Sequence, residues 1–486
     1  MGDFSKLVEE TLNSYQHLSK RHVHPRLQKM FELGGLNTSF NRAEGAYVWD
    51  TEGNRYLDLL AGGGVYFMGR NHPRIHEALI DVLSMKLPNL SVVNASVLGG
   101  LVAERLIGLA GDHFGKVVYA NSGSESNEVA IRFARQITRR RRYLYLEGAF
   151  HGRSYGAISV CGFPQMREGI DPAMPTCTPI RPNDLRQLKR ELAMEDVAGL
   201  IMEPVQGMTG EVLEPEYMRE AENLCRQHGT VLIMDEVQTG LGRTGAWFAS
   251  RAAGVRPDIM TVSKALSGGA APVAAVLVSD EIYEKVYSGF SSNLFYFSTF
   301  AENNLSMAAS LVTLDVLEDL DAPNDAARKG AILREGLEDL AARWDCVDRV
   351  TGKGLMQTIY FRDSARPSLA IQQKLMGVAD PAAFAASVHV DLFQRQRVIA
   401  QLPGPGRNAI KVLPPVVCTE EDIAYFLASL EDTLAGMYGS NGPVVSLGRG
   451  ILSQAVKKAR QLVPAEAPSL VDPSLAAEKK SPRPVS

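Results

Sequence analysis

Residues 258–278 read DIMTVSKALSGGAAPVAAVLV, and this stretch decides the fold class. Its two apolar runs, DIMTV and VAAVLV, show almost no polar alternation. The same holds for YLYL (143–146), VAGLIME (197–203) and VLIMD (231–235). Strands without alternation suit a mostly parallel sheet that helices cover on both faces. An amphipathic segment, EYMREAENLCRQH (216–228), lies among these runs. The pattern therefore predicts an α/β fold.

We expect four regions along the chain. A large α/β domain covers 61–325, and a smaller α+β domain follows at 326–438. An N-terminal segment, 1–60, is expected to pack with the smaller domain. The last stretch, 439–486, is rich in Pro, Ala, Ser and Lys and poor in aromatic residues. That composition predicts a disordered tail, because it buries too little apolar surface to order the chain.

Composition narrows the classes of function. The chain has 486 residues and a formal net charge of −4, which argues against a dedicated nucleic-acid binder or tight adhesion to anionic lipid. Its 5 cysteines are widely spaced without a CxxC pair, so we expect no disulfide framework and no metal site. We also expect no membrane insertion, since no apolar run approaches the ~20 residues that span a bilayer. A reducing cytoplasm fits best.

Two ionisable side chains follow predicted strands. Lys264 comes just after DIMTV, where partial desolvation would lower its pKa and make it a usable amine nucleophile. The alternative is a surface lysine in a turn. Asp235 closes VLIMD, and one use of a buried acid is to hold a proton on a pyridine nitrogen. The alternative is a helix cap or an internal ion pair. Open parallel sheets place ligand sites at the carboxyl ends of their strands, so the two positions support each other.

The segment ANSGSESNEVAIRFAR (120–135) predicts a strand followed by a helix. A helix N-terminus has unpaired N–H groups, and Gly123 lets the backbone approach a ligand closely. Ser122 and Ser124 add hydroxyl donors, so the turn can cradle a phosphate. The alternative is an ordinary capping box between Ser122 and Glu125.

Two further segments have residues that occur in ligand sites. In GAFHGRS (148–154), Phe150 and His151 can lay a flat ring over a flat cofactor, although packing alone also explains them. GLGRTG (240–245) fits GxGxxG, but a dinucleotide loop needs its first glycine directly after the strand. Four residues intervene here, which argues against an NAD site. The arginine run 139–142 predicts a solvated helix end.

Taken together, these segments resemble the class III, fold type I, pyridoxal-phosphate (PLP) aminotransferases of the ornithine, acetylornithine and ω-amine group. The resemblance runs from about residue 40 to about residue 430, in the family's order. The motifs are NSGSESNEVAIR, AFHG, IMEPVQG, LIMDEVQTGLGRTG, TVSKAL, STFAENNLSMAA, GKGLM and LPP. It implies a large domain with a mostly parallel sheet of the seven-stranded type, flanked by helices, plus the smaller domain.

The resemblance also implies roles for single residues. Lys264 would form a Schiff base with PLP and carry the proton, and Asp235 would pair with the pyridine N–H. The other implied cofactor contacts are Ser122, Gly123 and Ser124 around the phosphate, Phe150 stacked on the ring, His151 beside it, Gln238 near the ring's 3′ oxygen, and Glu203 behind the cofactor. Thr299 would reach the phosphate of a neighbouring subunit, which implies a homodimer with shared active sites.

The chain departs from the family pattern where ornithine-type members grip an α-carboxylate. Met208 and Lys411 stand where those members have a glutamate and an arginine. A lysine binds a carboxylate as a point charge, without the two-pronged fork of arginine. Tyr66 is a further candidate substrate contact. The predicted entry region is apolar, with Val65-Tyr66-Phe67 and residues 294–297, which indicates a substrate with a long or bulky apolar part. A dimer interface explains these aromatic residues equally well.

The sequence thus predicts an aminotransferase that moves an amino group from an amino acid or amine to an aldehyde or keto acceptor by ping-pong chemistry. An aminomutase, a racemase or a decarboxylase of the same fold is the nearest alternative. A non-catalytic binding protein on this scaffold and an oxidoreductase are more distant ones.

Overall fold

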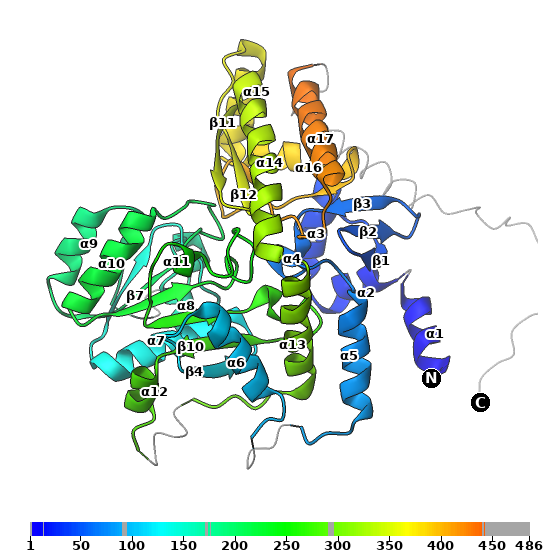
Figure 1. The fold of residues 1–486 in the computed structure, drawn as a ribbon. Coiled ribbons are helices and arrows are strands. Elements are labelled where there is room, and N and C mark those ends of the chain that lie inside the picture. Colours follow the sequence, from blue (N-terminus) through cyan, green and yellow to red (C-terminus); the bar gives the residue numbers. More distant parts are fainter. Residues whose placement is uncertain are drawn as a thin grey trace, which may run out of the picture.

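The computed structural model describes residues 2–12, 14–89, 95–170, 174, 176–289, 296–439 and 442 (Figure 1). Apart from Gly439 and Gly442, the predicted tail at 439–486 lies outside the described residues, and the prediction of disorder there stays untested.

The central sheet has seven strands among the described residues, in the order β4-β10-β9-β8-β7-β5-β6. β10 runs antiparallel to β4 and β9, and the other neighbouring strands are parallel. The strands are β4 (Lys116–Ala120), β5 (Arg142–Leu146), β6 (Cys177–Ile180), β7 (Val197–Met202), β8 (Val231–Asp235), β9 (Ile259–Val262) and β10 (Ala274–Val278). The α/β fold class that the apolar runs predict is confirmed.

Both faces of this sheet are buried, which explains why its strands lack polar alternation. Tyr143 and Tyr145 of β5 pack in one core with side chains of α7 (Gly123–Thr138). Leu144 and Leu146 face the opposite core, which also contains side chains of α9 (Leu185–Leu192) and α10 (Pro215–Gln227).

A third core lies where further helices cover the β4–β10–β9 part of the sheet. It includes side chains of α5 (Pro73–Ser84), α6 (Gly99–Ala110) and α13 (Asn304–Asp319). The remaining short elements of this part of the chain are α4 (Ala61–Gly64), α8 (Tyr155–Ser159), α11 (Ala249–Ala252), α12 (Asp280–Val286) and the 3-10 turns η1 (Pro164–Met166) and η2 (Lys264–Ser267).

A second unit lies above the central sheet in Figure 1. It has an antiparallel sheet of β11 (Val347–Gly352), β12 (Gln357–Phe361) and β14 (Ala409–Val412), covered by helices with their own apolar core. The helices are α14 (Ala322–Arg343), α15 (Pro367–Ala379), α16 (Ala383–Gln394) and α17 (Glu420–Tyr438). A capping box of Thr419 and Asp422 begins α17.

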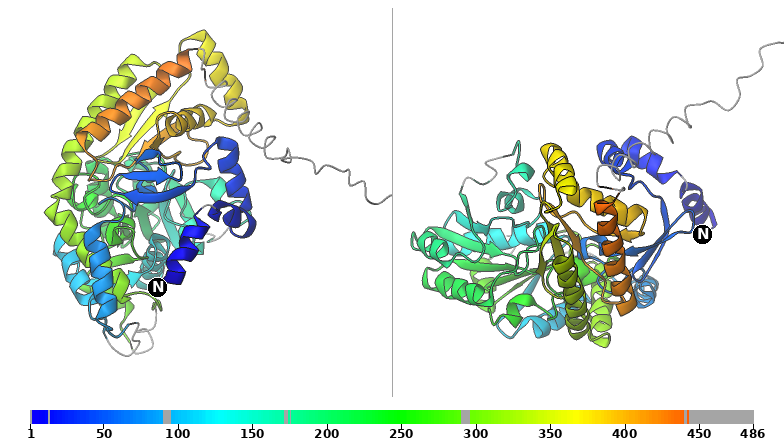
Figure 2. Two further views of the ribbon diagram at one scale, coloured as in Figure 1. Left: turned by 90° about the vertical axis from the view of Figure 1, so that its right-hand side faces the viewer. Right: turned by 90° about the horizontal axis from the view of Figure 1, so that it is seen from above.

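The N-terminal segment joins this second unit through a shared sheet. β2 (Tyr47–Asp50) and β3 (Arg55–Asp58) form an antiparallel hairpin, with β1 (Phe40–Glu44) on its outer side. β13 (Val398–Ile399) pairs parallel with β3. Three helices precede the sheet, α1 (Gly2–Thr11), α2 (Tyr15–His22) and α3 (Pro25–Gly34), and Figure 2 shows them at the edge of the molecule. The exact domain boundaries stay a prediction.

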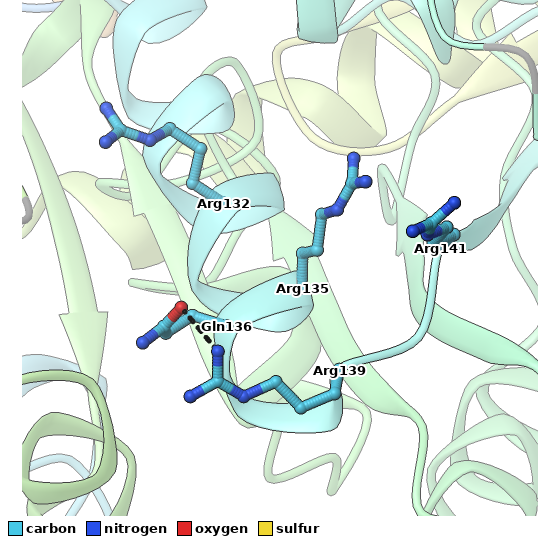
Figure 3. Close-up of a pocket in the computed structure, with 5 residues that line it drawn as sticks. All are labelled: Arg132, Arg135, Gln136, Arg139 and Arg141. Atoms are coloured by element: carbon cyan, nitrogen blue, oxygen red, sulfur yellow. Dashed lines mark hydrogen bonds between the residues drawn. The ribbon is translucent and has the colours of Figure 1, made fainter.

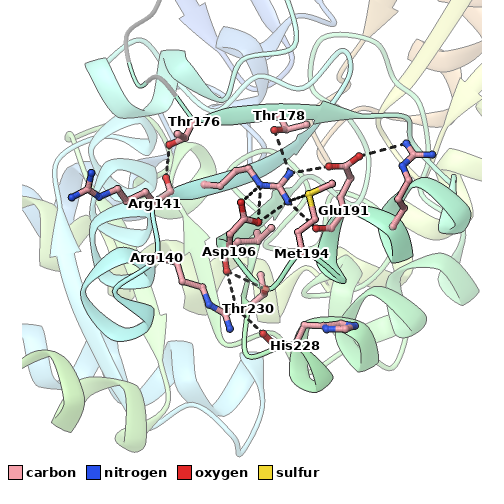
Figure 4. Close-up of polar contacts among 12 residues, drawn as sticks. Arg140, Arg141, Thr176, Thr178, Glu191, Met194, Asp196, His228 and Thr230 are labelled. Carbon is pink, nitrogen blue, oxygen red and sulfur yellow. Dashed lines mark hydrogen bonds and ion pairs between the residues drawn. The ribbon is translucent and has the colours of Figure 1, made fainter.

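The arginine run 139–142 was predicted to be a solvated helix end, but two of its four side chains form contacts within the fold. Arg142 forms ion pairs with Glu191 at 2.8 Å and Asp196 at 2.7 Å (Figure 4). Arg140 donates to the carbonyl oxygen of His228 at 2.6 Å. These two arginines therefore tie the ends of β5 and β7 to neighbouring loops.

The other arginines of this region point outward. Arg132, Arg135 and Gln136 of α7, with Arg139 and Arg141, line an open cavity of about 400 Å³ (Figure 3). Arg135 lies in the last turn of α7 and Arg139 is its C-cap, which matches the preference of cations for exposed helix carbonyls.

Candidate active site

Lys264 lies at the carboxyl end of β9, as the first residue of η2. Its backbone has φ +43°, a left-handed conformation that residues other than glycine rarely adopt. Such strain costs about 1–3 kcal/mol and clusters at functional sites. Burial lowers the pKa of the Lys264 amine, Asp235 and Glu203 oppose this shift, and the Arg243 cation adds to it. The net direction is down, which favours the free amine.

Asp235 ends the neighbouring strand β8 and is buried. Its Oδ2 accepts a hydrogen bond from Asn127 Nδ2 at 2.7 Å and lies 2.8 Å from His151 Nδ1. Its Oδ1 accepts from the backbone N–H of Val237 at 2.9 Å. These contacts fix the plane of the carboxylate at the edge of the sheet where Lys264 also lies.

Asn127 is a member of this network that the sequence analysis missed. Its amide group donates to Asp235 and also to the carbonyl oxygen of His151 at 2.7 Å, and its Oδ1 accepts from Thr261 at 2.8 Å. Asn127 stands one helical turn after Gly123, so it projects from the same face of α7. That spacing inside NSGSESN is a signal that could have identified it.

The Nε2 atom of His151 is buried and has no hydrogen-bond partner among the described residues. Buried polar atoms are almost always satisfied, so an unpartnered ring nitrogen marks a place for another group. His151 was expected beside the ring of a cofactor, next to Phe150. Its direct contact with Asp235 was not predicted.

The N-terminus of α7 has free backbone donors. No hydrogen bond among the described residues uses the N–H groups of Gly123 and Ser124. Ser122 caps the helix by accepting from Glu125 N at 3.1 Å. The Glu125 carboxylate accepts from Asn121 N at 2.8 Å instead of Ser122 N, so only half of a capping box forms. The turn remains able to hold a phosphate through its backbone.

The hydroxyl of Ser124 faces a different turn from the one expected. It accepts hydrogen bonds from the N–H groups of Arg153 at 2.8 Å and Ser154 at 2.9 Å. Gly123 is needed for packing, since a Cβ there would lie 2.8 Å from Val237. Ser124 and Gly123 thereby pack the turn at 122–124 against residues 153–154 and Val237.

Glu203 links two of the predicted site segments. It is buried, and its carboxylate accepts from the N–H of Phe150 at 3.0 Å and of Gly207 at 2.6 Å. Burial raises the pKa of Glu203, while His151 opposes the shift. The Glu203 carboxylate therefore fixes the backbone of Phe150 and with it the position of the ring.

The remaining predicted site residues differ in how far their side chains are exposed to solvent. Gln238 and Lys411 are buried and hydrogen-bonded to each other at 2.6 Å. Met208 is partly buried in an apolar cluster with Phe150. The Tyr66 ring lies under the Arg70 guanidinium at 4.1 Å. Thr299 is exposed, which leaves it available to another subunit.

The aromatic residues expected at the entrance do not form one group. Phe67 is fully buried, with the Arg243 guanidinium 4.5 Å from its ring centre, so the expectation that it flanks an entrance is wrong. Leu294 and Phe295 lie outside the described residues. Tyr296 is partly buried and donates to Glu125 at 2.7 Å. Phe297 is exposed.

Arg243 is the second residue that sequence reasoning missed, although it lies inside the GLGRTG segment. No helix begins at this segment, as a dinucleotide loop would require. The Arg243 side chain is buried and donates to the carbonyl oxygens of Leu355 and Pro414 at 3.2 Å and of Gly64 at 3.1 Å. It therefore joins the second unit to the glycine-rich turn at 62–64.

Replacing Asn127 by alanine is expected to destabilise the protein by about 1–3 kcal/mol, because Asp235 and Thr261 each lose a buried partner. PLP affinity should fall as well, since the carboxylate loses part of its orientation. Chemical denaturation and a PLP titration measure the two effects. Asn223→Ala, at an exposed position on α10, is the matched control and should change stability by less than about 0.5 kcal/mol. Equal effects of both variants would contradict the assignment of Asn127 to the site.

The donor set fits the PLP group that the resemblance implies. Four features meet at the carboxyl ends of the parallel strands of one sheet: an amine with a lowered pKa, a buried carboxylate, an unpartnered ring nitrogen and a helix N-terminus with free N–H groups. Among the described residues, no group of three or more His, Cys, Asp or Glu side chains is arranged to hold a metal ion. Of the helices that the structure describes, none is long and apolar enough to cross a membrane.

Known proteins resemble this chain along most of its length. Putrescine aminotransferase of Pectobacterium atrosepticum is 33% identical over 453 residues, which is 90% of this chain and 91% of the relative. The aminotransferase PigE of Serratia sp. is 33% identical over 355 residues, 73% of this chain, and this chain spans 41% of the length of PigE. An amine transaminase structure from an uncultivated Pseudomonas species, in a PLP-bound form, superimposes with a TM-score of 0.72 at 29% identity and covers 82% of this chain and 94% of its own.

The family model described as Aminotransferase class-III matches residues 33–434. That range includes every candidate residue of the site and both units of the fold. The chain belongs to the class III aminotransferases, and its cofactor is pyridoxal phosphate.

Proposed function

We propose that this chain transfers an amino group from a primary amine or amino acid to an aldehyde or keto acid, with Lys264 and Asp235 as its catalytic residues. The observation that supports this assignment most is the pairing of a desolvated amine on η2 with the Asp235–His151–Asn127 network at the end of β8. When bound, PLP supplies an electron sink that stabilises negative charge on the substrate carbon.

The side chains have separate tasks in this proposal. Lys264 takes a proton from the substrate carbon and returns it, since its lowered pKa leaves the amine free nearer to neutral pH. Asp235 holds a proton on the ring nitrogen of the cofactor. Asn127 and His151 keep the Asp235 carboxylate in that orientation. The N–H groups of Gly123 and Ser124 bind the phosphate.

We propose in addition that the amino donor carries an apolar chain. Phe150 and Met208 belong to an apolar cluster with Ile158, Cys161 and Phe163, which supports an apolar wall near the predicted ring position. The name of one relative, putrescine aminotransferase, indicates a different kind of donor for that protein, a short diamine. A screen of half-reactions distinguishes the two.

In that screen, the absorbance of the bound cofactor is followed while single amines and amino acids are offered. Alkyl amines of increasing chain length should react with increasing kcat/KM, with about 0.8 kcal/mol of binding free energy for each buried CH₂ group. Faster reaction with short diamines would contradict the apolar donor. Turnover without a second carbonyl substrate would indicate an aminomutase or racemase, and release of carbon dioxide a decarboxylase.

We infer that the active form is a cytoplasmic homodimer. Phe297 and Phe300 are exposed by 59% and 64% beside the exposed Thr299, and a second subunit would cover such a surface. The five free cysteines are consistent with a reducing compartment. Light scattering that gives the mass of a single chain at working concentration would contradict the dimer.

A further inference from the structure

Lys411 has no exposed surface, although its side chain ends in an amine. It lies on β14 of the second unit, and its Nζ reaches into the large unit. There it donates to the carbonyl oxygen of Gly207 at 2.6 Å and to Gln238 Oε1 at 2.6 Å. No ion pair or hydrogen bond joins it to a carboxylate among the residues that the structure describes.

These two bonds leave Lys411 little capacity for a substrate. A neutral amine has two N–H donors, and both acceptors are already in place; an ammonium has one more. Burial and the neighbouring Lys264 and Arg243 side chains hold the pKa of Lys411 well below its ordinary value, and Glu203 opposes the shift. A substrate carboxylate could reach Nζ only by displacing Gln238 or the Gly207 peptide.

The contact with Gln238 has a directional consequence. The carbonyl oxygen of Gly63 can only accept, so it requires the nitrogen of the Gln238 amide on its side, at 2.8 Å. The amide oxygen then points the other way, where it accepts from Lys411 Nζ at 2.6 Å. The Gly63 carbonyl thereby fixes an amide assignment that is otherwise ambiguous. One N–H of the amide remains for a ligand.

The contact with Gly207 links Lys411 to Glu203 and Phe150. The N–H of that residue donates to Glu203 at 2.6 Å, and the same carboxylate holds the N–H of Phe150. Lys411 thus steadies two of the segments that the proposed function assigns to the cofactor, from a strand of the other unit.

We propose that Lys411 is a positioning residue, which orients the Gln238 amide toward the cofactor and does not bind the carboxylate of a substrate. The inference rests on the proposed function and on the place near the PLP ring that the family resemblance implies for Gln238. A buried amine without hydrogen-bond partners is costly, so these two bonds are what allows Lys411 to be buried here.

The test is a double-mutant cycle read by PLP binding to the apoprotein, with Lys411→Met, Gln238→Ala and the double variant. Each single change should raise the dissociation constant of PLP by about 10- to 100-fold, as expected for the loss of one buried hydrogen bond to a charged or oriented group. If Lys411 acts through Gln238, the double variant should bind PLP no more weakly than the weaker single variant. Fully additive losses would overturn the proposal.

A second readout separates positioning from carboxylate binding. KM is compared for an α-amino acid and for the amine that lacks its carboxylate, in the wild type and in Lys411→Met. Equal changes for both donors are expected. A rise in KM confined to the amino acid, with PLP affinity unchanged, would show that Lys411 binds the carboxylate.

Folding and the proposed function are controlled separately. Lys411→Gln retains N–H donors, should recover part of the PLP affinity that methionine loses, and replaces Lys411→Met in the cycle if that variant does not fold. No recovery in folded Lys411→Gln would count against positioning by donation. A wild-type apoprotein that binds no PLP would refute the proposed function itself, whereas additive losses in the variants would refute only the positioning role of Lys411.

Discussion

Replacing Lys264 by alanine is expected to lower kcat/KM for transamination by at least about 10³-fold. A group that transfers a proton contributes about 10²- to 10⁴-fold to a rate, and the covalent attachment of the cofactor is lost as well. Steady-state kinetics with the best donor from the half-reaction screen measures the effect. The fold should persist, because alanine and lysine have similar strain at φ +43° and both retain the backbone of η2.

The matched control for this variant is Lys189→Ala on α9. Lys189 is exposed and pairs with Glu220 at 3.1 Å, so its loss should change activity by less than about twofold and stability by less than about 1 kcal/mol. Lys264→Ala with more than a tenth of the wild-type kcat/KM would contradict the role of Lys264 as the proton carrier.

The exchange of Asp235 for asparagine is expected to lower kcat by about 10²- to 10³-fold, the usual loss when one oriented electrostatic group is removed from an active site. An amide cannot hold a proton on the ring nitrogen as a carboxylate does, so the cofactor draws electrons less strongly. One partner of the carboxylate also loses its acceptor, because asparagine has a single oxygen where Asp235 accepts from Asn127 and Val237 on different oxygens. Stability should fall by about 1–3 kcal/mol.

Asp258→Asn separates the catalytic loss from the structural one. Asp258 precedes β9, at the opposite end of the sheet from Lys264, and accepts from the N–H of Leu232 at 2.7 Å. Asparagine keeps an oxygen for that bond, so the exchange should change stability by less than about 1 kcal/mol and leave kcat within about threefold, since Asp258 touches no group of the site. An equal fall in kcat for both variants would show that Asp235 acts through stability alone.

The fold could be predicted because its physical cause is visible in the chain. Strands buried on both faces need uninterrupted apolar residues, and β8, β9 and β10 have them. The positions of Lys264 and Asp235 followed from the same rule, since each comes at the end of such a strand. A local pattern was sufficient in both cases.

The contacts within the site depend on residues that are distant in sequence, and no local pattern reports them. Asn127 meets Asp235 across 108 positions, and Arg243 reaches the carbonyl oxygen of Pro414 across 171. Local competition decides other cases. The Ser124 hydroxyl accepts from the 153–154 backbone, a contact that was not predicted, and the Phe67 ring lies against Arg243 instead of at an entrance.

Lys411 illustrates the same limit at the level of function. Its residue type and its place before the two prolines suggested a weaker grip on a carboxylate. The fold instead closes the amine between Gly207 and Gln238, both from the other unit. Only the arrangement of the two units distinguishes a substrate contact from a positioning contact.

Mass spectrometry after borohydride reduction of the purified holoprotein tests the central claim most directly. Reduction makes the bond between the cofactor's aldehyde carbon and a lysine nitrogen permanent, so the modified peptide identifies the lysine. The peptide that contains Lys264 is predicted to carry the cofactor. A cofactor found on the Lys411 peptide, or no modified lysine in yellow protein, would contradict it.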